Sequence, residues 1–219
     1  MVSPIKKILV KHPKSAFVNQ SKIEQEYAGL NYIGIPDFNK ACVEYEKFLQ
    51  LISSFQIEVH SLPLSTKPTT LDSIYTHDPC VVSDEGIILC NMGKKDRSHE
   101  PYAIKEYFES LNIPILGNIE YPGKLEGGDV VWIDEKTIAI GEGYRSNSFG
   151  IKQLKIILGN LVEEVIPVPL PHWNGENDCL HLMSNISPVD HNLFLIYPRL
   201  LPVSFIKYLL DREIQLIEV

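Results

Sequence analysis

Hydrophobic positions along this chain switch repeatedly between strand spacing and helical spacing, and the same order of segments recurs. Short apolar runs that predict strands lie at residues 57–62, 113–116, 165–170 and 214–219. Each run follows an amphipathic stretch that predicts a helix, at residues 40–55, 102–111, 150–158 and 203–211. Paired apolar runs precede the last three helices and flank turns that begin at Asp84, Asp134 and Asp190. These turns recur roughly every 50 to 56 residues, which predicts an array of similar units.

The recurring order predicts an α/β protein of four structural repeats, at residues 1–64, 65–118, 119–171 and 172–219. The last three repeats each predict a hairpin, a helix and a strand, with hairpin strands at 80–83 and 87–90, 130–134 and 137–141, and 183–189 and 193–197. The first repeat has a strand at 5–11 and then a loop at 14–39, long enough to suggest a functional loop. No linker interrupts the chain, so we expect one domain over residues 1–219, with the helices packed outside the sheets.

Composition narrows the class of protein. The chain is 44% hydrophobic and 22% charged, as is ordinary for a soluble globular protein. No apolar run approaches the ~18 residues of a transmembrane helix, and residues 1–13 read as a strand rather than a signal peptide. A formal net charge of −8 argues against non-specific nucleic-acid binding and is compatible with a small cationic substrate. We therefore expect a cytoplasmic protein with reduced thiols that could form homo-oligomers.

Three polar clusters interrupt the apolar pattern next to the predicted hairpins, at residues 75–79, 125–129 and 177–184. The second cluster contains the pair Gly127 and Gly128, which permits a close approach that a side chain would block. Acids flank this pair at Glu126 and Asp129. Taken alone, the arrangement also fits an ordinary turn, so its significance depends on the other clusters.

Together the clusters are more specific. The chain contains, in this order, His77-Asp78-Pro79, Leu125-Glu126-Gly127-Gly128-Asp129-Val130, Gly143-Tyr144-Arg145-Ser146-Asn147 and Leu180-His181-Leu182. Their order and spacing resemble the guanidino-group modifying superfamily, which includes dimethylarginine dimethylaminohydrolases, arginine deiminases and amidinotransferases. The resemblance runs along the whole chain and implies the pentein fold, an α/β propeller of five ββαβ repeats around a central active site. Four of the five repeats would then be present here.

The resemblance also implies roles for individual residues. Asp78 would bind the guanidinium group, Glu126 would contact the substrate and orient the histidine, and His181 would be the general acid and base. Arg145 would bind the α-carboxylate of the substrate, with Arg97 a weaker candidate for the same task. We expect Gly127, Gly128 and Asp129 to be structural, with Asp129 bonding backbone amides around the glycine pair.

Each of these residues also has a plainer interpretation. An aspartate before a proline, as at Asp78, can simply open a turn. A single histidine beside a strand is often structural, and Arg145 could be a surface charge. The carboxylates nonetheless suit the chemistry, because the N–H groups of a planar guanidinium match a carboxylate in a bidentate way.

The match fails at the nucleophile, which in this superfamily is a cysteine in the fifth repeat. None of the chain's four cysteines occupies that position, and none follows His181. We therefore expect a chain that lacks its last repeat and is inactive alone, with Cys80 and Cys179 as weaker candidates for a relocated nucleophile. The cysteine and histidine spacing predicts no metal site, and the superfamily's reaction implies no cofactor.

Met183 bears on the type of reaction. Arginine deiminases and amidinotransferases usually place an aspartate at that position, so the arrangement is closer to the dimethylarginine dimethylaminohydrolases. We therefore expect the hydrolysis of a small substituted guanidine such as a methylated arginine, through a thiouronium intermediate, to a citrulline-type product and an amine. Two alternatives stay open: an amidinotransferase, and a non-catalytic guanidino-binding module or inactive fragment.

Overall fold

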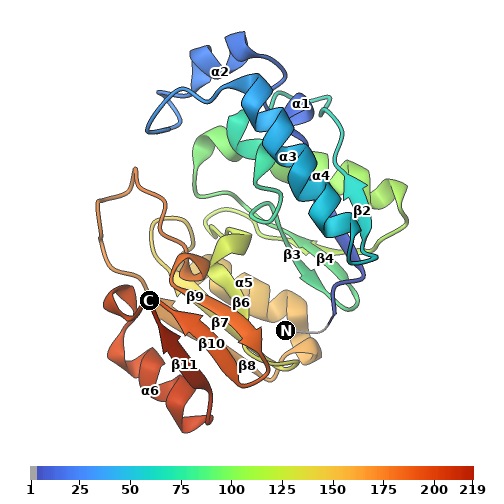
Figure 1. The fold of residues 1–219 in the computed structure, drawn as a ribbon. Helices are drawn as coiled ribbons and strands as arrows, with labels where there is room; N and C mark the ends of the chain where they lie inside the picture. Colours follow the sequence, from blue (N-terminus) through green and yellow to red (C-terminus); the bar gives the residue numbers. More distant parts are fainter. Residues whose placement is uncertain (1–3) are drawn as a thin grey trace. The chain divides into compact units, whose positions relative to one another are not determined.

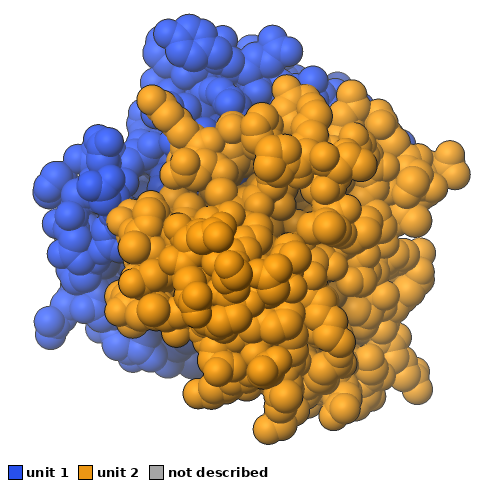
Figure 2. Space-filling view, turned by 90° about the horizontal axis from the view of Figure 1, so that it is seen from above, with its two compact units in different colours: residues 1–3, 77–93, 113–219 blue, residues 4–76, 94–112 orange. Residues whose placement is uncertain are grey.

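The protein divides into two compact units in a computed structural model that describes residues 4–219 (Figure 2). Unit 1 comprises residues 77–93 and 113–219, and unit 2 comprises residues 4–76 and 94–112. Residues 1–3 of the predicted first repeat lie outside the described residues. The division cuts across the predicted repeats, and the single domain stays a prediction.

Unit 1 contains three sheets of three strands each (Figure 1). The first is formed by β3 (Cys80–Ser83), β4 (Gly86–Leu89) and β5 (Ile115–Asn118). The second is formed by β6 (Val130–Trp132), β7 (Thr137–Glu142) and β8 (Glu164–Pro169). The third is formed by β9 (Ile186–Asp190), β10 (Leu193–Ile196) and β11 (Gln215–Glu218). Each sheet has an antiparallel hairpin whose second strand pairs in parallel with the third strand. These pairings confirm the hairpin–helix–strand order, while the closure of the repeats into a propeller stays a prediction.

Helices supply the crossover that a parallel pair needs. α5 (Ser148–Leu158) connects β7 to β8, and α6 (Val203–Asp211) connects β10 to β11. α5 begins where the side chain of Asn147 accepts the backbone N–H of Gly150, and it ends at Gly159, whose φ of 49° suits glycine. Unit 1 also contains four short 3₁₀ segments: η3 (Gly127–Asp129), η4 (Gly159–Leu161), η5 (Leu182–Ser184) and η6 (Pro198–Leu200).

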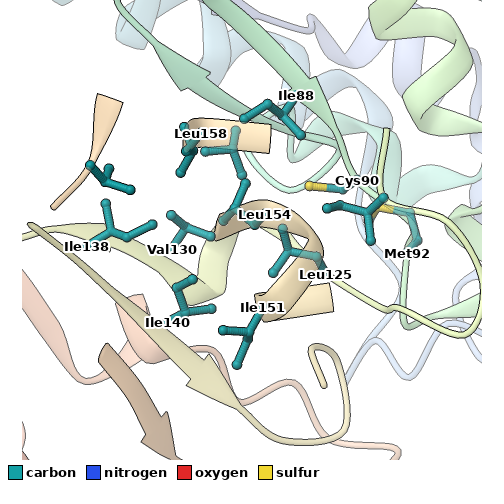
Figure 3. Close-up of a cluster of buried hydrophobic side chains, with 13 residues drawn as sticks. Ile88, Cys90, Met92, Leu125, Val130, Ile138, Ile140, Ile151, Leu154 and Leu158 are labelled. Carbon is teal, nitrogen blue, oxygen red and sulfur yellow. The ribbon is translucent and has the colours of Figure 1, made fainter. Parts of the chain in front are cut away.

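Two clusters of buried side chains hold unit 1 together. In the first, α5 inserts Ile151, Leu154 and Leu158 against strand residues that include Ile138 and Ile140 (Figure 3). In the second, residues of β9, β10 and α6 pack with Leu182, which follows the candidate histidine. The positions just before β6 and β9 are therefore fixed by core packing on both sides.

Unit 2 is built on one parallel strand pair, β1 (Lys7–Val10) and β2 (Glu58–Ser61). Its helical elements are α1 (Pro13–Ala16), α2 (Gln20–Glu26), α3 (Phe38–Ser53), α4 (Glu100–Ser110), η1 (Leu71–Ile74) and η2 (Lys95–Arg97). A small core of Ala16, Phe17, Ile23, Leu30 and Leu71 holds the loop segments together. Over residues 4–219, no helix is both long and apolar enough to cross a lipid bilayer.

Two segments differ from the sequence-based expectation. The predicted loop at 14–39 contains α2 and the end of α1, because the side chains of His12 and Asn19 accept backbone N–H groups and so cap each helix start. The strand predicted at 183–189 begins only at Ile186. Residues 182–184 instead form a 3₁₀ turn, closed by the His181 N–H, which donates to Ser184 Oγ, and by the Ser184 N–H, which donates to the His181 carbonyl.

We expect Leu154→Ala to destabilise the protein by about 2–5 kcal/mol, because the side chain is fully buried and its loss leaves a cavity. Ile156→Ala on the same helix is the matched control. Ile156 is 77% exposed, so its truncation should change the unfolding free energy by less than about 0.5 kcal/mol. Urea denaturation of both variants measures the difference, and equal losses would contradict the core assignment.

Candidate active site

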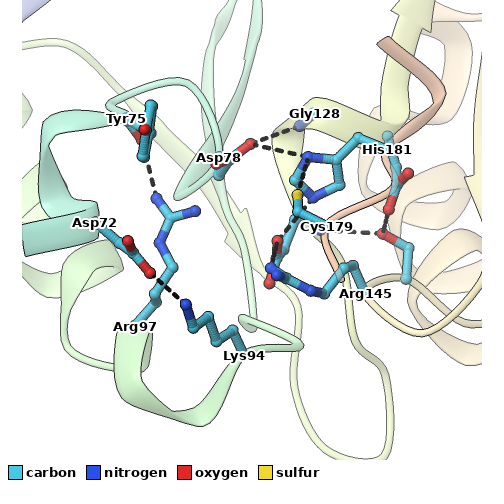
Figure 4. Close-up of polar contacts among 12 residues, drawn as sticks. Asp72, Tyr75, Asp78, Lys94, Arg97, Gly128, Arg145, Cys179 and His181 are labelled. Atoms are coloured by element: carbon cyan, nitrogen blue, oxygen red, sulfur yellow. Dashed lines mark hydrogen bonds and ion pairs between the residues drawn. The ribbon is translucent and has the colours of Figure 1, made fainter. Parts of the chain in front are cut away.

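Five of the residues predicted to form the site lie together in unit 1, on loops and 3₁₀ turns next to its strands. Asp78 lies before β3, Glu126 and Asp129 flank the glycine pair before β6, Arg145 lies in the loop after β7, and His181 caps the start of η5. All five are more than nine-tenths buried. Figure 4 shows Asp78, Arg145 and His181 directed toward one another.

Glu126 links the arginine and the histidine of this group. Its side chain is fully buried, and a single oxygen, Oε2, lies 2.8 Å from Arg145 Nη1 and 2.8 Å from His181 Nε2. Both contacts are charge-assisted hydrogen bonds in which the nitrogen donates. The carboxylate therefore fixes the guanidinium and the imidazole on two sides of itself.

His181 has its second ring nitrogen directed away from Glu126. Nδ1 lies 3.6 Å from Cys179 Sγ and 3.8 Å from Asp78 Oδ1 (Figure 4). Burial alone would lower the pKa of His181. Hydrogen bonds to Cys179 and Glu126, together with two nearby carboxylates, outweigh burial and raise that pKa to about 11. His181 is therefore an imidazolium at neutral pH.

The glycine pair brings Asp78 and His181 into contact with the backbone. Gly128 N–H donates to Asp78 Oδ1 at 3.1 Å, and Gly127 N–H donates to the carbonyl of Asp78 at 2.8 Å. A Cβ on Gly128 would lie less than 3.0 Å from both the His181 ring and the Asp78 carboxylate. On Gly127 it would collide with the carbonyl of His77. The pair thus allows the close approach predicted from the sequence.

Asp129 makes different contacts from those predicted. We expected it to bond amides around the glycine pair, but Asp78 does so instead. Asp129 Oδ1 accepts from the backbone N–H of Leu182 at 3.0 Å, and Oδ2 accepts from the Ser146 hydroxyl at 2.6 Å. The physical reason is the 3₁₀ turn at 127–129, which carries the Asp129 side chain away from the amides of the pair.

Arg97, the weaker candidate for carboxylate binding, lies in unit 2. Its Nε and Nη2 atoms donate to the Glu100 carboxylate at 2.7–3.1 Å, and Nη2 also donates to the carbonyl of Tyr75 at 3.0 Å. A second, partly buried ion pair of unit 2 joins Lys94 to Asp72 at 2.7 Å. Figure 4 shows both groups, and sequence reasoning did not anticipate the Lys94–Asp72 pair.

A cation could also be held in unit 1. Asp78, Glu126 and His181 each offer one ligand atom, and these atoms lie within 4.8 Å of one another. Glu126 already accepts hydrogen bonds from two cationic groups, so a metal would have to displace a proton or an arginine. The spacing along the sequence gave no sign of this cluster, and the expectation of no metal stays a prediction.

The cysteines differ sharply in environment. Cys80 and Cys90 are buried, and burial raises the pKa of Cys80 to about 12 and that of Cys90 well above its usual value. Neither thiol can form a thiolate near neutral pH. Cys179 is exposed and lies beside the imidazolium of His181. Only its position two residues before His181 could have pointed to this contact.

This arrangement is suited to the recognition and chemistry of a planar cation. Two carboxylates can accept N–H groups, and the imidazolium beside them can donate a proton to a leaving group. Gly128 leaves the space beside His181 and Asp78 free of a side chain. Arginine, histidine and carboxylates are thus assembled by backbone and core contacts within one unit.

Known proteins are similar to this chain in both sequence and fold. The arginine deiminase family model matches residues 53–214. A dimethylarginine dimethylaminohydrolase of Pseudomonas aeruginosa is 25% identical over 167 residues, which cover 75% of this chain and 61% of that protein. An arginine deiminase of Bacillus cytotoxicus is 29% identical over 133 residues, which cover 57% of this chain and 32% of that protein.

The solved structure of the Pseudomonas aeruginosa enzyme, as a cysteine-to-serine variant complexed with citrulline, superposes with a TM-score of 0.76 at 23% identity. The superposition covers 98% of this chain and 76% of that one, and it shows the α/β fold of the pentein proteins. The chain spans less than two thirds of the length of the two relatives compared by sequence. Because the family model covers well over half of its residues, this chain belongs to the arginine deiminase family of the pentein superfamily.

Proposed function

We propose that this chain carries the guanidinium-binding and proton-transfer groups of a hydrolase that cleaves a C–N bond of a small guanidine. The observation that carries the proposal is the Glu126 carboxylate, which holds His181 by Nε2 and leaves Nδ1 directed toward Asp78 and Cys179. The relatives support the class of reaction, since they are a dimethylarginine dimethylaminohydrolase and an arginine deiminase. The complex of one structural relative with citrulline supports a substrate related to arginine.

In the proposed reaction Asp78 binds the N–H groups of the guanidinium, and a thiolate attacks its central carbon. A carbon–sulfur bond forms, the carbon–nitrogen bond to the leaving amine breaks, and His181 gives its proton to that amine. The histidine then takes a proton from water, which attacks the thiouronium carbon and displaces the sulfur. The products are a ureido compound and an amine, and no cofactor takes part.

We propose that Arg145 binds the substrate α-carboxylate, while the same role for Arg97, which lies in unit 2, stays a prediction from the sequence. Arg145 is paired with Glu126 and Arg97 with Glu100, so either would have to share its guanidinium with the ligand. Arg145 is the stronger candidate, since it lies in the same cluster as Asp78 and His181.

The proposed reaction also has a nitrogen substituent on the guanidine and a group, water or an amine, that accepts the amidino carbon. Met183 stands in η5, where an aspartate would favour a deiminase or an amidinotransferase, so we propose a substituted guanidine such as a methylated arginine. An amidinotransferase shares the first half of the reaction but passes the amidino group to an amine. Product analysis with and without an added amine separates the two. The cytoplasmic location and self-association stay predictions.

The nucleophile has two candidate sources. One is a cysteine in a further repeat, as expected from the sequence resemblance. Cys179 is the alternative within the chain, because it is exposed, adjoins His181, and His181 is in turn oriented by Glu126. If neither thiol serves, the chain is a guanidino-binding module, and ligand binding with no product after long incubation would reveal it.

We expect Asp78→Asn to weaken the binding of L-arginine by at least about tenfold, since the carboxylate supplies a charge that an amide lacks. Asp134→Asn is the matched control: Asp134 pairs with Arg212 at a hairpin of the same unit, outside the cluster. Isothermal titration calorimetry measures both affinities. Equal weakening in the two variants would show that the effect is not local to Asp78.

We expect His181 to stay protonated between roughly pH 5 and 9, because its pKa is raised to about 11. A raised pKa means that this charge stabilises the fold fully below about 6.5 and that the contribution is lost as the pH rises through about 11. Imidazole NMR resonances followed through a pH titration test both statements. A midpoint near 6.5 would contradict the ion pair with Glu126.

We expect iodoacetamide to modify Cys179 before Cys80 or Cys90, which are buried and hold their protons. Mass spectrometry of the labelled peptides gives the order. Prior addition of L-arginine should slow labelling of Cys179 if that thiol lies at the ligand site. Protection that is lost in Asp78→Asn would link the thiol to the guanidinium site, whereas no protection would place Cys179 away from the ligand.

A further inference from the structure

We propose that Asp129 and Ser146 are positioning residues that hold Glu126 and His181 of the site in their relative positions. The inference deepens the proposed function and rests on it, since it concerns the same site. It starts from a series of linked hydrogen bonds that is buried throughout and lies within unit 1. Ser146 accepts the backbone N–H of Glu126 and Asp129 accepts the backbone N–H of Leu182, so both residues act on the backbone of the site segments.

The first half of this hydrogen-bond series reaches Glu126. The backbone N–H of Glu126 donates to Ser146 Oγ at 3.1 Å, and the Ser146 hydroxyl donates to Asp129 Oδ2 at 2.6 Å. A hydroxyl has a single proton to give. Because a backbone N–H can only donate, Ser146 must accept from Glu126 and must direct its own proton to Asp129. The partner at position 129 must therefore offer an acceptor there.

The second half of this hydrogen-bond series reaches the residue after His181. Asp129 Oδ1 accepts the backbone N–H of Leu182 at 3.0 Å, the first amide after the histidine. Ser146 also follows Arg145 in the sequence. One carboxylate thus joins the segments that carry Glu126, Arg145 and His181, the three side chains that meet at Glu126 Oε2.

The carboxylate has no room to move. Asp129 and Ser146 are fully buried, and a Cβ added at Gly141 would lie less than 3.0 Å from the Asp129 carboxylate. Two acceptor atoms are therefore held at fixed points between the two segments.

The charge at this position does not favour the fold. Burial raises the pKa of Asp129 from 3.8 to about 6, so the folded protein takes up a proton that the unfolded chain lacks between these values. The stability from this group accordingly falls as the pH rises from about 4 to 6, and the ionised carboxylate is a cost to folding at neutral pH. A residue needed only to brace the fold would not require that charge.

Asp129→Asn tests the proposal, because an amide keeps the shape of the carboxylate but has only one acceptor oxygen and cannot accept from both Ser146 and the Leu182 N–H. We expect the unfolding temperature at pH 8 to stay within a few degrees of the wild-type value. We expect the pKa of His181, measured by imidazole NMR, to fall by about one unit or more as a charge is lost and the ring shifts. Citrulline binding should weaken about tenfold, as for a lost hydrogen bond to a charged group.

Ser146→Ala and the double variant show whether the two residues act together. Because both interrupt one chain, the double variant should bind citrulline no more weakly than the worse single variant. Ser146→Thr keeps the hydroxyl and should restore at least part of the affinity lost in Ser146→Ala. Asp134→Asn, which removes a carboxylate elsewhere in the same unit, should leave the His181 titration unchanged.

Three results would overturn the proposal. One is Asp129→Asn with a large loss of stability and an unaltered His181 titration, which would make the residue a brace of the fold. Another is additive losses in the double variant. The third is equal affinities for Ser146→Ala and Ser146→Thr, which decides the matter even if Asp129→Asn fails to fold. If neither the wild-type protein nor any variant binds citrulline but His181 titrates as expected, the proposed function fails and the positioning role stands.

Discussion

The site of unit 1 depends on one buried carboxylate that serves two cations. Glu126 has no exposure to solvent, and an isolated negative charge there would be strongly disfavoured. Arg145 and His181 compensate it from two directions, and the histidine is held as an imidazolium in return. Removal of Glu126 would leave the two buried cations without the carboxylate that they share. The arrangement of Asp78, the glycine pair and Asp129 is best understood as what keeps these three groups in place.

The sequence was informative where local chemistry determines structure. Hairpin turns at Asp84, Asp134 and Asp190 and the amphipathic helices that follow them were located correctly, because turn residues and helical periodicity act over a few residues. The glycine pair was also understood correctly, since a residue without a side chain before a strand indicates a close approach. The resemblance of the polar clusters then brought Asp78, Glu126, Arg145 and His181 into one list, and unit 1 places all four together.

Tertiary contacts were beyond reach of the sequence. Nothing local tells that Asp129 bonds an amide 53 residues away rather than one beside it. The short turn after His181 was taken for the start of a strand, because Met183 and its neighbours fit both conformations until the backbone of Leu182 is held by that carboxylate. The contact between Cys179 and His181 and the ion pairs of unit 2 likewise depend on how distant segments meet. The division of the chain into two compact units left no signal in composition either.

Gly128 has a consequence for reading other sequences. Its missing side chain leaves the volume that the His181 ring and the Asp78 carboxylate approach, so the backbone at this point is one wall of the site. Any larger residue at that position would push the imidazole away from its acid before altering the fold elsewhere. A chain of the same fold with another residue there must hold its histidine differently, whatever else it retains. A glycine at this position therefore distinguishes sequences that can form this arrangement of histidine and acid from sequences that share only the fold.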